Sequence, residues 1–253
     1  MKKIKKITTV LLMFILTVCV TPVTAHADSK KVLQSGITYR QYDFNGDGKK
    51  DTFKYVLTRE NGAAYAKIYL NGCCRGKMDM MRGGSLTRVA TSKKDIFLIA
   101  LKGGFSGNAL TAYKISGNRI IQVRDLTHFT YNQVYKVSNN KLYIKCSTGK
   151  EFGGTFDCRY SRGASFIFTH SVKNRSISSV NVGYPTGTKV YTAGTSFRTS
   201  TSTSYMNGKG FYVYRGQKVT LKKIYCKSDG TWFQISANGR TGWIKNSSSY
   251  LLK

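Results

Sequence analysis

Asparagine–glycine pairs punctuate this chain and separate short runs of β-branched and aromatic residues. Four such pairs stand beside strand-like segments such as residues 64–70, AYAKIYL: Asn61-Gly62, Asn71-Gly72, Asn207-Gly208 and Asn238-Gly239. An Asn–Gly pair between two alternating segments is typical of a hairpin closed by a tight turn. After residue 27 the sequence keeps one proline, Pro185, and shows no amphipathic helix pattern. The chain is therefore predicted to be all-β.

The first 27 residues have the pattern of a secretory signal peptide. Four lysines precede an apolar run over residues 7–20, and the small-x-small sequence Ala25-His26-Ala27 follows. This order is typical of a signal that is cleaved before Asp28. A membrane anchor is the alternative, but threonines interrupt the run and it is shorter than the roughly 20 residues of a span. We expect an exported protein, secreted or associated with the cell wall, with no membrane span after cleavage.

The chain carries a formal net charge of +30. Removing the first 27 residues takes away four lysines and no acids, which leaves 37 basic and 11 acidic residues. Such an excess attracts anionic molecules, so a polyanionic partner is predicted. Outside a cell the abundant polyanions are teichoic acids, acidic polysaccharides, anionic lipid surfaces and stray nucleic acid, of which nucleic acid is the least expected partner. The alternative is that the cations only keep a Ser/Thr-rich β protein soluble.

The cysteines do not define a single framework. Cys19 belongs to the signal-like segment, and five remain: Cys73, Cys74, Cys146, Cys158 and Cys226. Export permits disulfides, and Cys146 and Cys158 are candidates for one across neighbouring strands, but sequence alone leaves the pairing open. Since no CxxC pair exists and only His128 and His170 follow the signal, a structural zinc site is not expected.

A weak repeat runs through the N-terminal part. Residues 50–53, KDTF, are followed by IYLNG at 68–72, and residues 94–97, KDIF, by YKISGN at 113–118. A third approximate unit extends from Tyr135 to Phe168. Three units are too few for a closed propeller, which needs at least about four blades. We expect a β-propeller-like or β-sandwich domain of two to three repeated hairpin units over residues 28–182, with residues 174–188 as a linker.

Residues 43–51 read DFNGDGKKD, with acceptor side chains at positions one, three, five and nine and glycine at six. This spacing suits a hard cation, but Lys54 replaces the glutamate of an EF-hand and a strand pattern follows. The loop resembles the calcium motif of VCBS and FG-GAP repeats, which are β-propeller blades. The resemblance implies a structural Ca²⁺ whose ligands would be Asp43, Asn45, Asp47, the Lys49 carbonyl and Asp51. The alternative is a turn whose acids are simply solvated.

The segment from residue 190 to residue 253 contains three further motifs. They are SFRTS at 196–200, GTWFQI at 230–235 and GRTGWI at 239–244. These resemble the opening, the Trp strand and the Gly-x-x-Gly-Trp signature of bacterial SH3 (SH3b) domains. The resemblance implies a small SH3-like barrel over residues 184–253 that binds peptidoglycan or an anionic cell-wall polymer. Ser200-Thr201 stands in place of the usual Gly-Pro, and residues 206–211 are an insertion beside the expected groove, so the ligand stays open.

The aromatic and cationic residues of this segment are expected to form a ligand-binding surface, which we call the shelf. Rings would stack on peptide or sugar faces while cations pair with carboxylates or phosphates. Strand alternation does not decide whether Tyr212 and Trp232 face the ligand or the core. Trp243, which directly follows Gly242, is expected in the core. The predicted ligand-binding residues are Arg198, Tyr205, Tyr212, Tyr214, Trp232 and Arg240.

Catalysis is not expected from this sequence. Its only glutamates, Glu60 and Glu151, stand in separate polar turns, whereas glycan hydrolysis needs two carboxylates about 5 to 9.5 Å apart. Cys73 or Cys74 could pair with a histidine, but no nucleophile motif surrounds them. The predicted function is non-catalytic tethering to the cell envelope. The alternatives are a polyanion- or host-surface-binding adhesin driven by charge, and a cysteine-dependent wall hydrolase.

Overall fold

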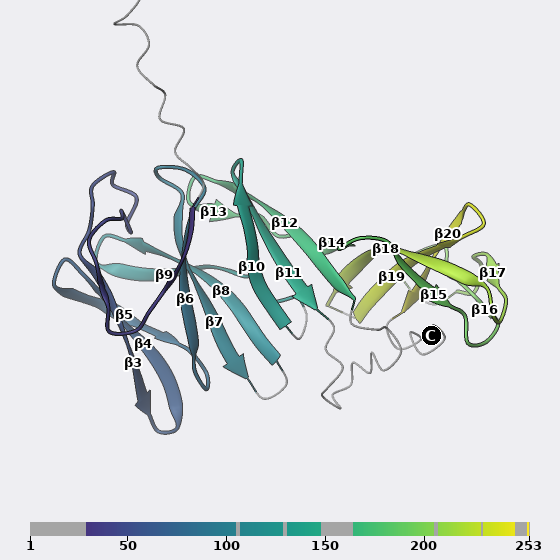
Figure 1. The fold of residues 1–253 in the computed structure, drawn as a ribbon, viewed down its shortest axis with the longest axis horizontal. Helices are drawn as coiled ribbons and strands as arrows, with labels where there is room; N and C mark the ends of the chain where they lie inside the picture. Colours follow the sequence, from purple (N-terminus) through teal and green to yellow (C-terminus); the bar gives the residue numbers. More distant parts are fainter. Residues whose placement is uncertain are drawn as a thin grey trace, which may run out of the picture.

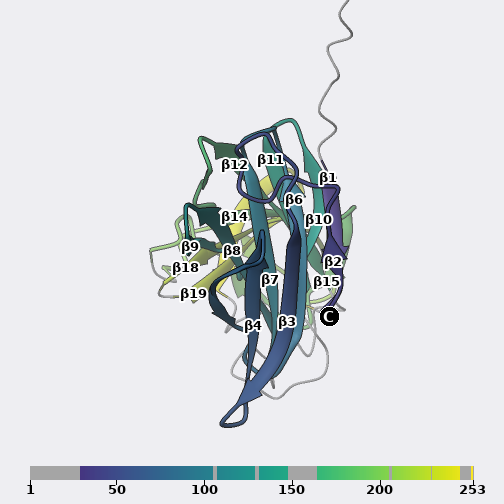
Figure 2. The same ribbon diagram turned by 90° about the vertical axis from the view of Figure 1, so that its left-hand side faces the viewer.

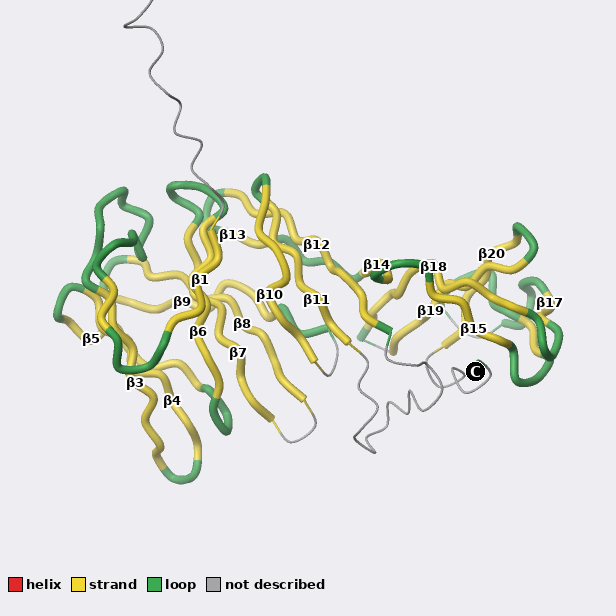
Figure 3. Tube along the Cα trace, viewed as in Figure 1, coloured by secondary structure: helices red, strands yellow, loops and turns green. Residues whose placement is uncertain are grey.

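A computed structural model describes residues 29–104, 107–128, 131–147, 164–204, 207–228, 230–245 and 252. Throughout these residues the regular elements are β-strands joined by loops (Figure 3). The all-β prediction is therefore confirmed. Since this part of the chain has no helix, it has none that could cross a membrane. The signal-like segment, residues 1–27, lies outside the described residues.

The first unit is a four-stranded antiparallel sheet. The predicted Asn–Gly turns close its hairpins, and Asn61, Gly62, Asn71 and Gly72 all have positive φ, as tight hairpin turns require. Along β4, buried and half-buried residues alternate, so one face of the sheet packs inward. The strands, in sheet order, are β2 (Thr38–Tyr39), β3 (Phe53–Glu60), β4 (Ala63–Leu70) and β5 (Cys73–Asp79).

The second unit is a five-stranded antiparallel sheet that the N-terminal strand joins at one edge. The two KDxF motifs stand at equivalent places, because β3 begins at Phe53 and the corresponding strand β7 begins at Ile96, beside Phe97. Most of β7 is buried on both faces, so this sheet lies between two others. Its order is β1 (Ser29–Leu33), β6 (Gly84–Ala90), β7 (Ile96–Gly104), β8 (Gly107–Ser116) and β9 (Arg119–Asp125).

The third unit begins a longer sheet that continues into the C-terminal part. Its first strands are β10 (Tyr131–Ser138), β11 (Lys141–Ser147), β12 (Ser165–Lys173) and the short β13 (Ser176–Ile177). Figure 1 shows the three units in succession, and Figure 2 views them from the end at β3 and β4. One core cluster, containing Ile68 and Leu98, joins the first unit to the second, and another, containing Phe97 and Ile144, joins the second to the third. The N-terminal part is a stack of three sheets.

The C-terminal part adds its own antiparallel strands around a third core cluster that includes Val213, Ile224 and Phe233. The sheets are not closed into a continuous barrel. Isolated antiparallel bridges join Ala193 to Leu252 and Ser200 to Trp243. The strands are β14 (Val182–Pro185), β15 (Lys189–Thr192), β16 (Phe197–Arg198), β17 (Tyr212–Val213), β18 (Lys218–Lys227), β19 (Gly230–Ala237) and β20 (Arg240–Lys245).

Strand β14 connects the two parts of the chain. It pairs with β12 through Phe168 and with β18 through Ile224, and Gly183 is the partner of both residues. The segment 174–188, expected as a linker, thus contributes β13 and β14 to sheets, and the expected boundary at residue 183 falls within a strand. Sequence reasoning missed this because Ser, Asn and Gly are typical of loops, whereas the pairing depends on strands far apart in the chain.

Candidate functional site

Three of the predicted shelf residues lie together on β16 and in the β17 region. Tyr212 pairs with Arg198 across the two strands, and the Arg198 guanidinium lies 5.7 Å from the Tyr212 ring centroid. The Tyr212 and Tyr214 rings are in edge-to-face contact with centroids 4.8 Å apart. Val213 between them points into the core, so alternation turns both rings outward, 40% and 65% exposed. We call Arg198, Tyr212 and Tyr214 the Tyr212 patch.

The other shelf residues do not join this patch. Trp232 is only 1% exposed, with strands β18 and β20 on either side and the Lys245 ammonium 5.9 Å from its ring centroid. Such a ring is not available for stacking on a ligand. Arg240 is exposed at the β19–β20 turn, where the structure gives it no contact with the patch. Tyr205 lies outside the described residues.

Trp243 differs from its sequence-based expectation. It was expected in the core, yet it is partly exposed, with the Lys223 ammonium 5.4 Å from its ring centroid. The neighbouring Ile244 occupies the core instead. The alternation of Phe233 and Ile235 along β19, and of Ile244 along β20, fixes which side of the sheet faces inward. That apolar alternation was the sequence signal that could have placed Trp243 outside the core, but it puts Trp232 on the same face and does not account for the burial of Trp232.

The described thiols are all free. Cys146 on β11 is buried, and burial, then the nearby Cys226, raises its pKa to about 12. Burial also raises the pKa of Cys226 to about 11. Both thiols stay protonated at neutral pH and are poor nucleophiles. Cys158 lies outside the described residues, so its disulfide with Cys146 stays a prediction. Cys73 and Cys74 are exposed at the start of β5.

Two histidines from distant parts of the chain form a hydrogen-bonded pair. His128 Nε2 lies 3.0 Å from His170 Nε2, and His170 Nδ1 lies 2.8 Å from the Ser178 carbonyl oxygen. A carbonyl only accepts, so His170 Nδ1 carries a proton and its Nε2 accepts the Nε2–H of His128. The His128 ring is also stacked on Phe168, with centroids 3.7 Å apart. Each ring is therefore fixed in one orientation.

The histidine pair is arranged to share a proton. Its ring centroids are 5.2 Å apart, close to the largest separation that a 3.0 Å nitrogen distance allows, so the rings lie nearly end to end. Two imidazoles on one zinc ion direct their lone pairs to a common point about 2.0–2.1 Å from each nitrogen. In the end-to-end arrangement the two Nε2 atoms point at each other, so both rings would have to tilt before they could bind one zinc ion.

A polar cavity of about 530 Å³ lies beside this pair, where the N-terminal stack meets the C-terminal strands. Arg124 and Asp125 at the end of β9 line it from one side, and Cys226 and Thr231 line it from the other. The cavity therefore contains imidazole and carboxylate groups, but its thiol is protonated. These residues lack an activated nucleophile.

The calcium-type loop is closed by its own hydrogen bonds. The Asp43 carboxylate accepts the backbone N–H groups of Asn45, Gly46 and Gly48, and Asp47 Oδ1 accepts that of Lys49. In the part of the chain that the structure describes, no three His, Cys, Asp or Glu side chains are placed to hold a metal ion. Calcium binding by the residues of this loop stays a prediction.

Asp51 has a structural role in the same loop. It is 3% exposed, and its two oxygens accept the Phe44 N–H at 2.8 Å and the Asn71 side-chain N–H at 2.8 Å. The loop also packs on the second unit, since a Cβ on Gly46 would lie 2.7 Å from the Lys94 carbonyl oxygen. These contacts hold the loop against two neighbouring turns.

Asp51→Ala is expected to lower the free energy of unfolding by about 3 kcal/mol. The reason is that the buried Phe44 N–H and the Asn71 side-chain N–H both lose their charged acceptor. Asp47→Ala is the control, since Asp47 is exposed and it should change stability little. Both variants are to be melted in chelator and in calcium. A normal midpoint for Asp51→Ala in chelator would contradict the structural role. A calcium-dependent rise that Asp47→Ala abolishes would assign the ion to the loop.

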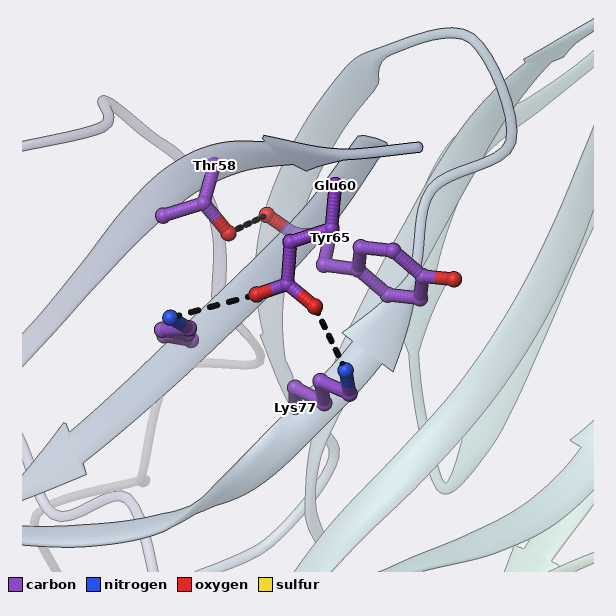
Figure 4. Close-up of polar contacts among 5 residues, drawn as sticks. Thr58, Glu60, Tyr65 and Lys77 are labelled. Carbon is purple, nitrogen blue, oxygen red and sulfur yellow. Dashed lines mark hydrogen bonds and ion pairs between the residues drawn. The ribbon is translucent and has the colours of Figure 1, made fainter. Parts of the chain in front are cut away.

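Glu60 is held in two ion pairs and is not placed for acid catalysis (Figure 4). Its carboxylate lies 3.2 Å from the Lys67 ammonium and 2.8 Å from that of Lys77, which also lies over the Tyr65 ring. The bonds to Lys77 and then Lys67 lower the pKa of Glu60. Glu60 therefore stays ionised and cannot serve as a general acid near neutral pH.

Comparisons with known proteins found no match to this chain among protein-family models, curated proteins or solved structures.

Proposed function

We propose that this chain is a non-catalytic binding protein of the cell envelope that holds peptidoglycan or an associated anionic wall polymer. The exposed Tyr212 patch carries the proposal, because it joins two rings and a guanidinium in the segment that resembles an SH3b domain. Rings of this kind stack on peptide or sugar faces, and a guanidinium pairs with carboxylates or phosphates. The signal-like N-terminus supports an envelope location.

The charge distribution supports an anionic ligand. Residues 184–253 contain eleven Lys or Arg residues and one acid, Asp229. The described acids of the N-terminal part are used locally. Glu60 takes the ion pairs found among the described residues, and the aspartates accept backbone N–H groups, as Asp79 does from Met81 and Asp125 does from Thr127. The described residues of the C-terminal part include no Asp or Glu, which favours an anionic ligand for this part of the chain.

Pelleting with purified peptidoglycan tests the proposal. The whole exported chain, residues 28–253, is the appropriate sample, because a fragment that begins at residue 184 would cut β14. Tyr212→Ala/Tyr214→Ala is expected to weaken binding about tenfold through loss of the stacking surface. The matched control is Tyr135→Ala/Tyr184→Ala, which removes two rings that are 51% and 59% exposed outside the patch. Failure of the wild-type chain to pellet at moderate salt, or equal loss in both variants, would contradict it.

A charge-driven polyanion binder is the second candidate, and the excess of 37 basic over 11 acidic residues after residue 27 favours it. It differs from the first in its response to salt and to the patch. Binding driven by charge alone should weaken steeply as ionic strength rises and should be equal for the two tyrosine variants. The same pelleting assay, repeated over a salt series on walls with and without their anionic polymers, separates the two.

A further inference from the structure

Strands β18, β19 and β20 carry a second aromatic and cationic cluster on their outer face. Ile224 on β18 and Ile244 on β20 point into the C-terminal core. Because successive residues of a strand point to opposite faces, Tyr225 and Trp243 lie on the outer side of the sheet. We use the term Trp243 face for four partly exposed side chains on these strands: Lys223, Tyr225, Trp243 and Lys245.

The strand register brings these side chains together. Lys223 and Trp243 are both partners of Gln234 on the central strand β19, so they lie in one row across the sheet. The Lys223 ammonium is 5.4 Å from the Trp243 ring centroid. The Tyr225 ring is 6.3 Å from Trp243 with the two planes inclined at 56°. We call these two inclined rings the cradle.

Within the described part of the chain, no carboxylate pairs with the lysines of this face. Among the described residues that follow Asp125, none is Asp or Glu. The contact between Lys77 and Tyr65 on the first unit is of the same kind, but there Glu60 pairs with the ammonium at 2.8 Å (Figure 4). An anion that approaches Lys223 and Lys245 therefore meets positive charge with no such acid among the described neighbours.

We propose that the Trp243 face binds an acidic glycan, with a sugar ring packed in the cradle and its anionic groups paired with Lys223 and Lys245. An exposed cation–π contact is weak, so an ammonium can exchange the indole for a carboxylate or phosphate. The 56° inclination suits a puckered sugar ring better than a planar base, which needs a flat platform. This surface adds a second contact to the proposed function, which depends on the Tyr212 patch.

Titration of the exported chain with polygalacturonate oligosaccharides, with neutral dextran for comparison, tests this surface. The chain has two tryptophans, and the Lys245 ammonium lies 5.9 Å from the ring centroid of the buried Trp232, so the Trp243→Val variant identifies the part of a glycan-dependent change in fluorescence that comes from Trp243. Lys223→Gln/Lys245→Gln is expected to raise Kd about tenfold, and Trp243→Val by a similar factor with loss of the signal. Lys31→Gln/Lys141→Gln, which removes the same charge from exposed N-terminal positions, should change Kd less than about twofold.

Three outcomes would overturn this proposal: no binding of polygalacturonate by the wild-type chain, equal loss in both lysine pairs, or tighter binding of oligo(dT). If Trp243→Val lowers the thermal midpoint, the Lys223→Gln/Lys245→Gln variant still tests the proposal. Tyr212→Ala/Tyr214→Ala should bind polygalacturonate like the wild-type chain. Failure at the Trp243 face is therefore distinct from failure of peptidoglycan binding.

Discussion

Gly183→Ala is expected to lower the free energy of unfolding by about 3 kcal/mol, because the added methyl group has no space between two buried side chains. A Cβ at this position would lie 2.6 Å from Phe168 Cε2 and 2.9 Å from Ile224 Cγ2. Phe168 and Ile224 are both fully buried and belong to the same core cluster, so neither can move away easily. Denaturant unfolding of the two chains measures the effect.

A double-mutant cycle with Phe168→Leu identifies the cause. Leucine lacks the ring atoms that the new methyl group would meet, so Gly183→Ala should cost clearly less in the Phe168→Leu background. Equal costs in both backgrounds would show that the steric account is wrong.

The position of Gly183 also has a consequence for function. Its strand is hydrogen-bonded to β12 of the third unit and to β18 of the C-terminal part. A ligand held by the C-terminal strands is therefore connected to the N-terminal stack through a continuous sheet rather than a flexible tether. The N-terminal stack therefore keeps a fixed position relative to any ligand that the C-terminal part binds.

The features that the sequence predicted well are local. Asn61-Gly62 and Asn71-Gly72 favour φ > 0 without help from distant residues, and both occur as hairpin turns. The two KDxF motifs, 44 residues apart, lead into the equivalent strands β3 and β7. Local turn chemistry and the alternation of apolar residues were enough to establish an all-β chain.

The features that sequence reasoning missed depend on pairing between distant strands. Trp232 and Trp243 both lie on the side of the sheet opposite to the core residues Phe233 and Ile244, yet Trp232 is buried and Trp243 is partly exposed. The histidine pair joins residues 42 apart in the chain, and no local pattern marks either one. The pairing of β14 with two strands likewise arises only when both neighbours are in place. These are the places where tertiary packing decides the outcome.

Acidification from pH 7 to pH 5 is expected to destabilise the metal-free chain through the histidine pair. Burial, followed by the nearby His170, lowers the pKa of His128 to about 3, and the pKa of His170 is lowered by burial and by Arg124. Asp125 acts in the opposite direction on His128, and the hydrogen bond to the Ser178 carbonyl does so on His170. Cys226 and Lys227 line the same cavity from β18. In the folded state both rings therefore resist protonation.

The direction of the effect follows from proton uptake. An unfolded histidine has a pKa of about 6.5, so below this pH the unfolded chain binds protons that the folded chain does not. For His128 the stabilisation is complete above about pH 6.5 and is lost as the pH falls towards 3, which amounts to a loss of about 2 kcal/mol at pH 5, and His170 contributes in the same direction. The window from pH 7 to pH 5 avoids the titration of most carboxylates.

His128→Gln/His170→Gln is the variant that tests this origin. The only other histidine in the sequence is His26, in the segment expected to be removed on export, so the variant should have no titrating imidazole left. Its free energy of unfolding should stay nearly constant between pH 7 and pH 5 while that of the wild-type chain falls. Parallel slopes for the two proteins would assign the acid sensitivity to other groups. A flat wild-type profile would mean that the pair opens and accepts protons in the folded state, because only equal proton uptake by both states removes the pH dependence.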